Sequence, residues 1–361
     1  MIIDELDQKI ISLIQKGVDS PPDDKEFSEL ALSLFQYQFD NNEPYQKYCR
    51  SLSLTPEQVS SWREIPAVPT SAFKAVRLAS FPPEKTIKVF HTSGTTQSKS
   101  GEHYLDSLSL YHASLNDNFK KHLLPEYEKI PMLSLTPSPL EAPHSSLIFM
   151  IDDCMELFSS IDKAFFILND ALDTKGLTRK LKKYEDSQEP ILLMGTAFSF
   201  VHWIDFCTEN HLQFHLNPES RIMETGGFKG KSREVAKSLL YAKLDELFNI
   251  PQTHIINEYG MTELGTQFYD NKLFEQPSPE KVFKNIPPWS RVLIIDPETG
   301  HHVEEGNLGM IRIIDLSNRG SVIAVQTEDI GFKIQDGFDI KGRNPRAIPR
   351  GCSLGIDEIL S

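Results

Sequence analysis

The chain has 361 residues, of which 39% are hydrophobic, so it can bury one large core or two moderate ones. It carries 37 basic and 51 acidic side chains, and the net charge of −14 excludes broad attraction to nucleic acid or anionic lipid. No segment has the roughly 18 consecutive apolar residues of a membrane span, and the charged N-terminus is not a signal peptide. Four scattered cysteines indicate neither a disulfide framework nor a zinc site, and we expect a cytoplasmic protein.

Helical patterns dominate the first seventy or so residues. Apolar side chains recur at three-to-four spacing between Ile2 and Ile14. The stretch TPEQVSSW predicts a further helix, with Thr55 as N-cap, Pro56 at the first helical position and Gln58 completing a capping box. We therefore expect an N-terminal helical segment over residues 1–64.

From about residue 65, short apolar runs alternate with helical patterns, which is typical of an α/β fold. In open α/β sheets, ligands bind beyond the carboxyl ends of the strands, so we expect the motifs that follow these runs to gather at one edge. The pairs of strand and following segment are TIKVF with HTSGTT and a helix at 110–124, ILLMG with TAFSFVHWIDF, RIMETGG with SREVAKSLLYAKLDELF, and THIINEYG with MTELG.

After about residue 288 the pattern becomes one of strands joined by turns that contain glycine or aspartate. RVLIIDPETG, LGMIRIIDL, SVIAVQTEDIGFKI and FDIKG predict a β-rich lobe. The predicted organisation is an α/β body over residues 65–341 that includes this lobe, and a short C-terminal tail over residues 342–361.

The stretch VFHTSGTTQSKSGEH, residues 89–103, has the composition of a phosphate-binding loop. It follows a predicted strand and precedes a predicted helix, where backbone N–H groups can line an anion, and Gly94 permits close approach. It lacks the GxxxxGK[ST] spacing of a Walker loop, so the chemistry of P-loop nucleotidases is not indicated. Taken alone, such a stretch is more often a solvent-exposed turn.

Three further motifs follow in order, YGMTE at 259–263, TEDIG at 327–331 and KGR at 341–343. Together with TSGTT at 92–96 they resemble the adenylate-forming superfamily of acyl-CoA ligases, luciferases and adenylation domains. The resemblance implies that the first loop holds the phosphates of ATP, the second segment contacts nucleotide and metal, an aspartate binds the ribose, and a Gly-Arg pair begins a mobile C-terminal domain.

The side chains in these motifs suit those tasks physically. Tyr259 can lay an aromatic face on adenine, Thr262 can donate to the α-phosphate, and Glu263 is a hard oxygen ligand fit for Mg²⁺. Asp329 can accept hydrogen bonds from both ribose hydroxyls. Each has an alternative role, because Tyr259 could fill a core, Glu263 could favour a helix start, and Asp329 could be a turn residue.

The segment METGGFKG would allow close approach of a flat base at two glycines, and His144 is a candidate for contacting the acyl carboxylate or lining its pocket, although a loop histidine is more often structural. The loop departs from the superfamily pattern TSGTTGxPK, since Gln97 replaces the third glycine and the lysine falls one place early. The resemblance implies these ATP-binding residues: Thr92, Ser93, Gly94, Thr95, Thr96, Lys99, Gly226, Gly227, Tyr259, Gly260, Asp329 and Arg343.

Only 18 residues follow Arg343, too few for the further domain that supplies the adenylation lysine in that superfamily. The tail instead contains Cys352, preceded by the cations Lys341, Arg343, Arg346 and Arg350. Nearby cations favour the thiolate, which is the nucleophilic form, so Cys352 is a candidate acyl acceptor. The alternative is an inert cysteine beside basic residues that bind phosphate or solvent. The other three cysteines lie in apolar stretches and are predicted to be packing residues.

The short chain, VPTSAFK, METGG and the tail RGCSL resemble the acyl-protein synthetase family of the LuxE type, from about Ile65 to the C-terminus. The resemblance implies a ligase that adenylates a fatty acid with ATP and Mg²⁺ and passes the acyl group to Cys352, from which a partner reductase takes it, as in bacterial bioluminescence. A CoA ligase similar to phenylacetate-CoA ligase is the closest alternative, and an inactive binding subunit is another.

Overall fold

The computed structural model describes residues 3–21, 23–92, 100–226, 235–275, 278 and 281–343. The chain forms two compact units, each assembled from separate stretches of sequence. Unit 1 comprises Met1–Asn118, Met261–Phe268 and Phe283–Ser361, and unit 2 comprises Phe119–Gly260 and Tyr269–Val282. The boundaries predicted near residues 64 and 341 stay predictions.

Unit 2 is built on a sheet with strand order β11-β10-β9-β8-β4-β5, in which β5, β4, β8, β9 and β10 run parallel. Parallel strands covered on both faces need continuous apolar runs, and in β8 the side chains of Leu192, Leu193 and Met194 are all fully buried. The strands are β4 (Met132–Leu135), β5 (Ala164–Phe165), β8 (Leu192–Thr196), β9 (Arg221–Thr225), β10 (Ile255–Tyr259) and the edge strand β11 (Phe268–Tyr269).

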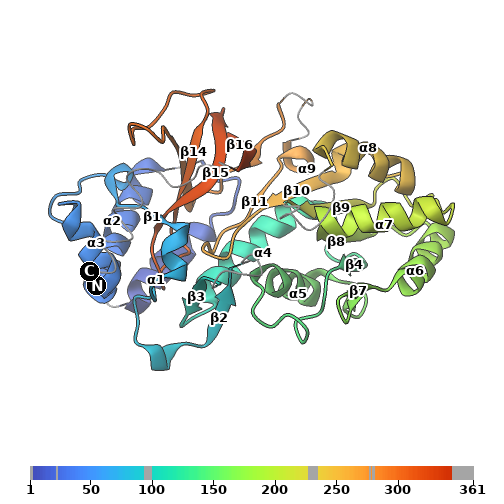
Figure 1. Ribbon diagram of the computed structural model, residues 1–361, viewed down its shortest axis with the longest axis horizontal. Coiled ribbons are helices and arrows are strands. Elements are labelled where there is room, and N and C mark those ends of the chain that lie inside the picture. Colours follow the sequence, from blue (N-terminus) through green and yellow to red (C-terminus); the bar gives the residue numbers. More distant parts are fainter. Residues whose placement is uncertain are drawn as a thin grey trace. The chain divides into compact units, whose positions relative to one another are not determined.

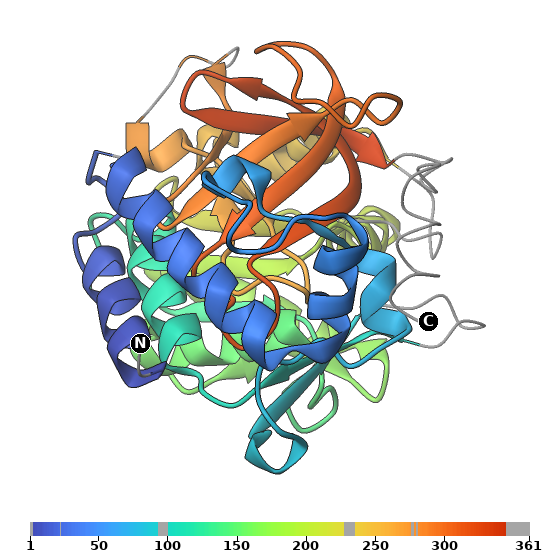
Figure 2. The same ribbon diagram turned by 90° about the vertical axis from the view of Figure 1, so that its left-hand side faces the viewer.

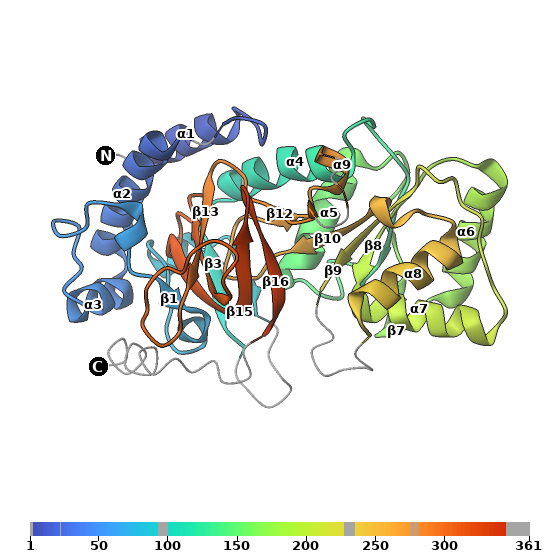
Figure 3. The ribbon, with the colours of Figure 1, turned by 90° about the horizontal axis from the view of Figure 1, so that it is seen from above.

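Helices cover both faces of this sheet, with α7 and α8 on one side and α5 on the other (Figures 1 and 3). Alternate strand residues such as Leu133, Leu193, Ile222 and Ile255 share one core with α6, α7 and α8. No helix among the described residues is long and apolar enough to span a bilayer. The remaining elements of unit 2 are α5 (Ser146–Phe158), β6 (Ile167–Leu168), β7 (Ala171–Leu172), α6 (Thr174–Ser187), α7 (Ala197–Glu209), α8 (Lys237–Phe248), η4 (Gln252–His254) and α9 (Lys272–Glu275).

Unit 1 contains a second sheet, with strand order β12-β16-β15-β14-β13 and antiparallel pairing throughout this path. A short strand from the N-terminal region, β1 (Val68–Pro69), adds a parallel pair to β15. The β-rich lobe that the sequence predicts is confirmed by strands β12 (Lys284–Asn285), β13 (Ser290–Ile295), β14 (Gly309–Asp315), β15 (Ala324–Ile334) and β16 (Gly337–Arg343).

The predicted helical start of the chain is also confirmed, and Figure 2 shows these blue helices in front of the orange and red strands of the unit 1 sheet. Helix α2 begins where the Asp23 side chain accepts hydrogen bonds from the amides of Lys25 and Glu26. The N-terminal elements are α1 (Ile3–Ile14), α2 (Asp24–Asn41), α3 (Glu43–Ser51), η1 (Trp62–Glu64), η2 (Thr70–Lys74) and η3 (Pro83–Lys85).

The helix predicted to start at Thr55 is wrong, because the stretch forms a single turn. The Gln58 side chain does accept from the Thr55 amide at 3.0 Å, but the Thr55 hydroxyl donates to Glu57 and Gln58 and so caps no helix. A second capping box follows at once, between Ser61 and Glu64, and starts the 3₁₀ helix η1.

The predicted phosphate-binding loop, called the hydroxyl-rich loop below, comprises residues 92–100. The sequence predicts that it lies between a strand and a helix, and its setting in the structure differs. The preceding strand, β2 (Lys88–His91), pairs antiparallel with β3 (Glu102–Leu105), and only then does helix α4 (Ser109–Leu123) begin. The loop therefore joins two strands of a hairpin, and β2 is not part of the parallel sheet. The sequence predicts that the segments after TIKVF, ILLMG, RIMETGG and THIINEYG gather at the edge of one sheet. That expectation is wrong for the hydroxyl-rich loop, which follows TIKVF.

Leu193 offers a test of the unit 2 core, because it is fully buried in β8. We expect Leu193→Ala to lower the free energy of unfolding by about 2–5 kcal/mol, through lost burial and the cavity left behind. Urea denaturation followed by circular dichroism measures it. The control is Leu239→Ala on α8, where the leucine is 50% exposed and a change within about 0.5 kcal/mol is expected. Equal effects of the two substitutions would contradict the assigned core.

Candidate active site

In unit 2, two predicted site segments meet at the carboxyl edge of the parallel sheet. Thr196 of β8 pairs with Thr225 of β9, and Thr225 pairs in turn with Glu258 of β10, so the three strands end side by side. Gly226 follows β9 directly, and Tyr259 is the last residue of β10. The structure thus brings Gly226 and Tyr259 together, with Gly260 next in the chain, while Gly227 lies outside the described residues.

A buried polar cluster supports this edge from below. The Asn257 amide group donates to the Glu224 carboxylate at 2.8 Å and to the Glu224 carbonyl at 3.1 Å, and the Tyr241 hydroxyl donates to the same carboxylate at 3.1 Å. Burial, followed by the charge of Glu224, raises the pKa of Tyr241, which therefore stays a donor. Among the described residues, the nearest atom to a methyl group placed on Gly226 would be the Asn257 side-chain nitrogen, at 3.9 Å.

His144 lies on the connection that leaves the carboxyl end of β4 and leads to α5. Its side chain is exposed in a turn, next to Ser145, whose hydroxyl accepts from the Ile148 amide at 3.3 Å and caps α5. The candidate histidine therefore follows the same edge of the sheet as Gly226 and Tyr259.

In unit 1, the described flanks of the hydroxyl-rich loop are tied to each other. The Thr92 amide donates to the Gly101 carbonyl at 2.8 Å, and the Gly101 amide donates to the Thr92 hydroxyl at 2.8 Å. A methyl group on Gly101 would lie 3.1 Å from the Phe73 backbone and from the Thr92 side chain, so a larger residue would be tightly packed here. The candidates Ser93, Gly94, Thr95, Thr96 and Lys99 lie outside the described residues.

Thr262 is held against this hairpin from both sides. Its hydroxyl donates to the His91 carbonyl at 3.3 Å, and His103 Nδ1 donates to the Thr262 carbonyl at 2.6 Å. Burial lowers the pKa of His103, so the neutral imidazole carries its proton on Nδ1. The end of β2, which leads into the hydroxyl-rich loop, and Thr262 of the YGMTE segment are thus neighbours in unit 1.

The segment after Glu263 is fixed by one buried carboxylate, that of Asp315 at the end of β14. It accepts from the amides of Gly265 and Thr266, each at 3.0 Å, and from the Thr266 hydroxyl at 2.8 Å. It also accepts from the Ser317 amide at 3.0 Å and the Ser317 hydroxyl at 2.6 Å. Burial raises the pKa of Asp315, and the hydrogen bonds act in the opposite direction. Five donors converge on one side chain.

Further buried amides hold the carbonyl groups of the same segment. Asn318 donates to the Glu263 carbonyl at 2.8 Å, and Asn118 donates to the Gln267 carbonyl at 2.7 Å. The Asn318 carbonyl in turn accepts from the Gln38 side chain of α2 at 3.0 Å. The Glu263 side chain is buried, and its backbone cannot shift without breaking the bond to Asn318.

An ion triad secures the β14–β15 connection that carries Asn318. The Arg319 guanidinium is 4% exposed and contacts Asp7 of α1 at 2.9 and 3.0 Å and Asp106 at 2.8 Å. Bidentate pairs of this kind fix geometry as well as charge. Helix α1 thereby contacts the same connection that positions the YGMTE segment.

Asp329 and Arg343, the candidates from TEDIG and KGR, are directly opposite each other in the β15–β16 pair. The Asp329 amide donates to the Thr327 hydroxyl at 3.1 Å, and the exposed Arg343 forms an ion pair with Glu328 at 2.9 Å. The structure therefore brings together two motifs that lie a hairpin apart in the sequence.

Three cysteines are buried in the cores, as the sequence predicts. Burial raises the pKa of Cys49 to about 12 and that of Cys207 to about 12, and it raises the pKa of Cys154 well above its usual value. Such thiols are almost entirely protonated near neutral pH and are poor nucleophiles. The candidate acceptor Cys352 lies outside the described residues.

A family model described as "Acyl-protein synthetase, LuxE" matches residues 3–361. The chain belongs to the LuxE acyl-protein synthetase family. Two similar proteins are the long-chain-fatty-acid–luciferin-component ligases of Aliivibrio fischeri and Vibrio harveyi. The first is 24% identical to this LuxE-family chain and the second 22%, and the alignments cover 92% of the chain in both cases and 88% and 87% of the relatives.

Solved structures confirm the fold class of this LuxE-family protein as that of the adenylate-forming CoA ligases. An open conformation of 2-hydroxyisobutyryl-CoA ligase matches with a TM-score of 0.65 and 12% identity, over 91% of this chain and 77% of that one. MatB from Rhodopseudomonas palustris matches with a TM-score of 0.51 and 14% identity, over 73% of this chain and 49% of that one. At these identities the likeness concerns the fold.

Several residues that organise the candidate site carry no motif of their own. Asp315, Asn318, His103 and Glu224 are buried polar side chains in strands or in the turns that follow them. The sequence gives one sign of their importance, which is a polar residue within or next to a predicted strand. A buried carboxylate or amide in such a place needs several hydrogen-bond partners. The sequence does not say which partners those are.

The Asp315→Asn substitution tests the network. Asparagine keeps one acceptor oxygen but places an NH₂ group against N–H donors, so we expect the free energy of unfolding to fall by about 3 kcal/mol or more. Amides in a peptide covering residues 262–268 should exchange with deuterium about tenfold faster or more. The control is Asp296→Asn in an exposed turn, where Asp296 accepts from the Glu298 amide at 2.7 Å. Unchanged exchange in the Asp315 variant would contradict the network.

The buried thiols make a separate prediction. A thiol with a pKa of about 12 is about 0.01% thiolate at pH 8. In a Cys352→Ser variant, native protein should therefore take up almost no iodoacetamide, and protein unfolded in urea should take up label at Cys49, Cys154 and Cys207. Intact mass spectrometry counts the adducts. Rapid labelling of the folded variant would show that one of these thiols is accessible.

Proposed function

We propose that this protein is an ATP-dependent acyl-protein synthetase that activates a fatty acid as acyl-AMP and transfers the acyl group to Cys352. Membership of the LuxE family supports the overall reaction. The observation that carries the assignment to particular residues is the rigid setting of Thr262 and Glu263 beside the β2–β3 hairpin that bears TSGTT.

In the first step, a carboxylate oxygen of the fatty acid attacks the α-phosphorus of ATP, and pyrophosphate leaves as the acyl-AMP anhydride forms. The Thr262 hydroxyl would turn from the His91 carbonyl and donate to the α-phosphate. Because His103 and Asn318 already fix the backbone at 262 and 263, little reorganisation accompanies the reaction. His144 would contact the carboxylate of the acid or line its pocket.

The nucleotide would be held by residues from each motif. Gly226 carries no side chain and lies at a strand end beside the aromatic ring of Tyr259, which suits a flat base, and Asp329 offers a carboxylate for ribose hydroxyls. The proposed ATP-binding residues remain Thr92, Ser93, Gly94, Thr95, Thr96, Lys99, Gly226, Gly227, Tyr259, Gly260, Asp329 and Arg343.

The donor chemistry also fits Mg²⁺, which takes one or two carboxylates and completes its shell with phosphate oxygens and water. Glu263 would be the carboxylate, in keeping with its place in the YGMTE segment. When bound, the ion would neutralise phosphate charge. Glu263 is suited to this role because its backbone is anchored through Asn318.

In the second step, the Cys352 thiolate attacks the carbonyl carbon of acyl-AMP, a thioester forms, and AMP leaves. Lys341, Arg343, Arg346 and Arg350 precede this cysteine in the sequence and would favour its thiolate. The acyl group would then pass to a partner, for which an acyl-protein reductase is proposed.

Labelling with radioactive fatty acid tests both steps. Protein incubated with the acid, ATP and Mg²⁺, without CoA, should acquire label that survives denaturation and is released by hydroxylamine. Cys352→Ser should lose the label and keep ATP–pyrophosphate exchange, because only the second step needs the thiol. Cys207→Ser is the matched control and should label normally. Equal labelling of wild type and Cys352→Ser would contradict the transfer of the acyl group to Cys352. Formation of free acyl-CoA when CoA is added would indicate a CoA ligase instead.

A further inference from the structure

Helix α6 concentrates positive charge in a chain that is otherwise acidic. Five of the 37 basic side chains fall within residues 175–183, although the net charge of the whole chain is −14. The helix packs on the unit 2 core through Leu177, Leu181 and Tyr184, so its basic side is presented on a fixed support. The five cations are Lys175, Arg179, Lys180, Lys182 and Lys183.

None of these five cations forms an ion pair with an acidic side chain in the part of the chain that the structure describes. Some cations of unit 2 are paired, since Lys163 contacts Asp152 at 2.8 Å and Glu156 at 3.1 Å. The cations of α6 outnumber its two acidic side chains, Glu185 and Asp186, and are available to an anionic partner.

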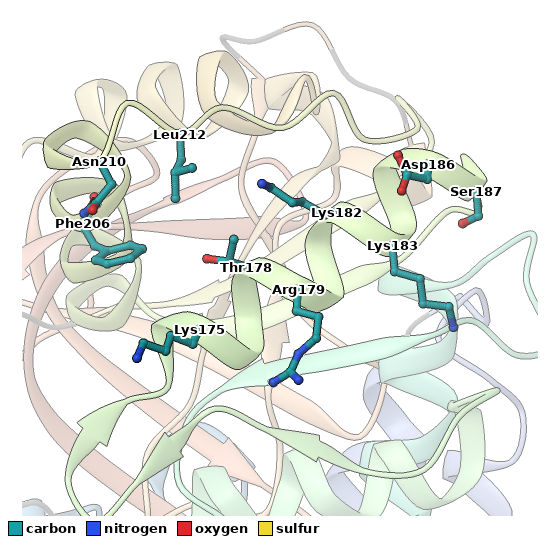
Figure 4. A pocket seen from close by; sticks show the side chains of 10 residues that line it. All are labelled: Lys175, Thr178, Arg179, Lys182, Lys183, Asp186, Ser187, Phe206, Asn210 and Leu212. Atoms are coloured by element: carbon teal, nitrogen blue, oxygen red, sulfur yellow. Dashed lines mark hydrogen bonds between the residues drawn. The ribbon is translucent and has the colours of Figure 1, made fainter.

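Four of the five cations, all except Lys180, line a groove of about 940 Å³ between α6 and the end of α7, and Asp186 is the one acidic side chain in this lining. Figure 4 shows Lys175, Arg179 and Lys183 along one side of the helix, as expected for residues four positions apart, and Lys182 reaching toward Leu212. Phe206 also lines the groove and is half-buried. Cations and apolar side chains thus share one concave surface.

The topology places the start of α6 at the functional edge of its sheet. The helix lies between β5 and β8, which both run parallel to β4, so it runs back from the carboxyl edge to the amino edge. The Asp173 amide, at its N-cap, donates to the carbonyl of Phe166 just after β5, at 2.7 Å. Lys175 and Arg179, in the first turns, are therefore on the same side as Gly226 and Tyr259.

A thioester on the enzyme must be discharged before a second turnover, so the proposed function requires an acceptor that approaches the protein. We propose that the α6 groove docks an acidic surface of the protein that takes the acyl group. This inference rests on the proposed function, because the docked protein is the acceptor of the acyl group in that reaction. Phe206 and Leu212 would contact apolar side chains of that partner, and the cations would steer its acidic residues.

A protein partner fits this surface better than nucleic acid or a membrane does. A long polyanion or an anionic bilayer would be repelled by the remaining acidic surface of a chain with a net charge of −14. An acidic patch on a protein surface, with apolar side chains beside it, could bind within the groove and avoid the acidic surface around it. The half-buried Phe206 and Leu212 would add contacts that a phosphate backbone cannot use.

The test compares two variants with the same change of charge. The groove variant combines Lys175→Glu, Arg179→Glu and Lys182→Glu, and the control combines Lys25→Glu, Lys85→Glu and Lys129→Glu, which are exposed and do not line the groove. Calorimetry measures the Kd for a purified acyl-protein reductase at about 50 and about 300 mM NaCl. We expect the groove variant to raise the Kd about 30-fold or more, the control to raise it less than about threefold, and the salt dependence to weaken only in the groove variant.

Pyrophosphate exchange separates this inference from the proposed function. All three proteins should exchange equally, and no exchange in the wild type would overturn the proposed function itself. With exchange intact, an unchanged Kd in the groove variant, or an equal loss in the control, would overturn the docking surface. Groove-dependent sedimentation with phosphatidylglycerol vesicles but not with the reductase would also overturn it. A glutamine version of the groove variant, expected to show a smaller loss, guards against misfolding of the glutamate version.

Discussion

The buried Asp315 carboxylate is the constraint on which the unit 1 site depends. A charged group inside a protein is tolerated only when donors surround it, and here the donors are the backbone and hydroxyl of the segment after Glu263 and the residue that begins the next turn. Stabilising the carboxylate and fixing the segment are therefore one requirement. Because Gly265 approaches Ser317 so closely that a methyl group would lie 2.6 Å from its hydroxyl, the residue there must also be small.

The N-terminal helices extend this arrangement outward. Gln38 of α2 donates to the carbonyls of Asn318 and Arg319 and accepts from the Ile323 amide at 2.7 Å, while Arg319 contacts Asp7 of α1. A segment far from the motifs in sequence thus encloses the connection that positions them. These helices form part of the site's support as well as part of the core.

The periodicity of the sequence predicts most of the fold, and the exceptions are local. The parallel strands of unit 2 and the antiparallel lobe follow from long apolar runs, but β3 is only four residues long and reads EHYL, with no apolar pattern to reveal it. The Thr55 turn has every residue of a capping box, yet the Thr55 hydroxyl donates to the side chains of Glu57 and Gln58, and no helix follows. The motifs YGMTE and TEDIG point to Thr262, Glu263 and Asp329 as candidate site residues. Asp315 and Asn318 contact residues about fifty positions away in the sequence, and no local sequence pattern predicts such contacts.

The burial of three thiols has a chemical consequence for a protein proposed to carry an acyl thioester. Thioesters exchange readily with thiolates, so a second reactive cysteine would let the cargo migrate to a position from which no acceptor could retrieve it. By keeping Cys49, Cys154 and Cys207 inside the cores with raised pKa values, the fold removes these dead ends. The burial of these packing residues would thereby also confine the acyl group to a single cysteine.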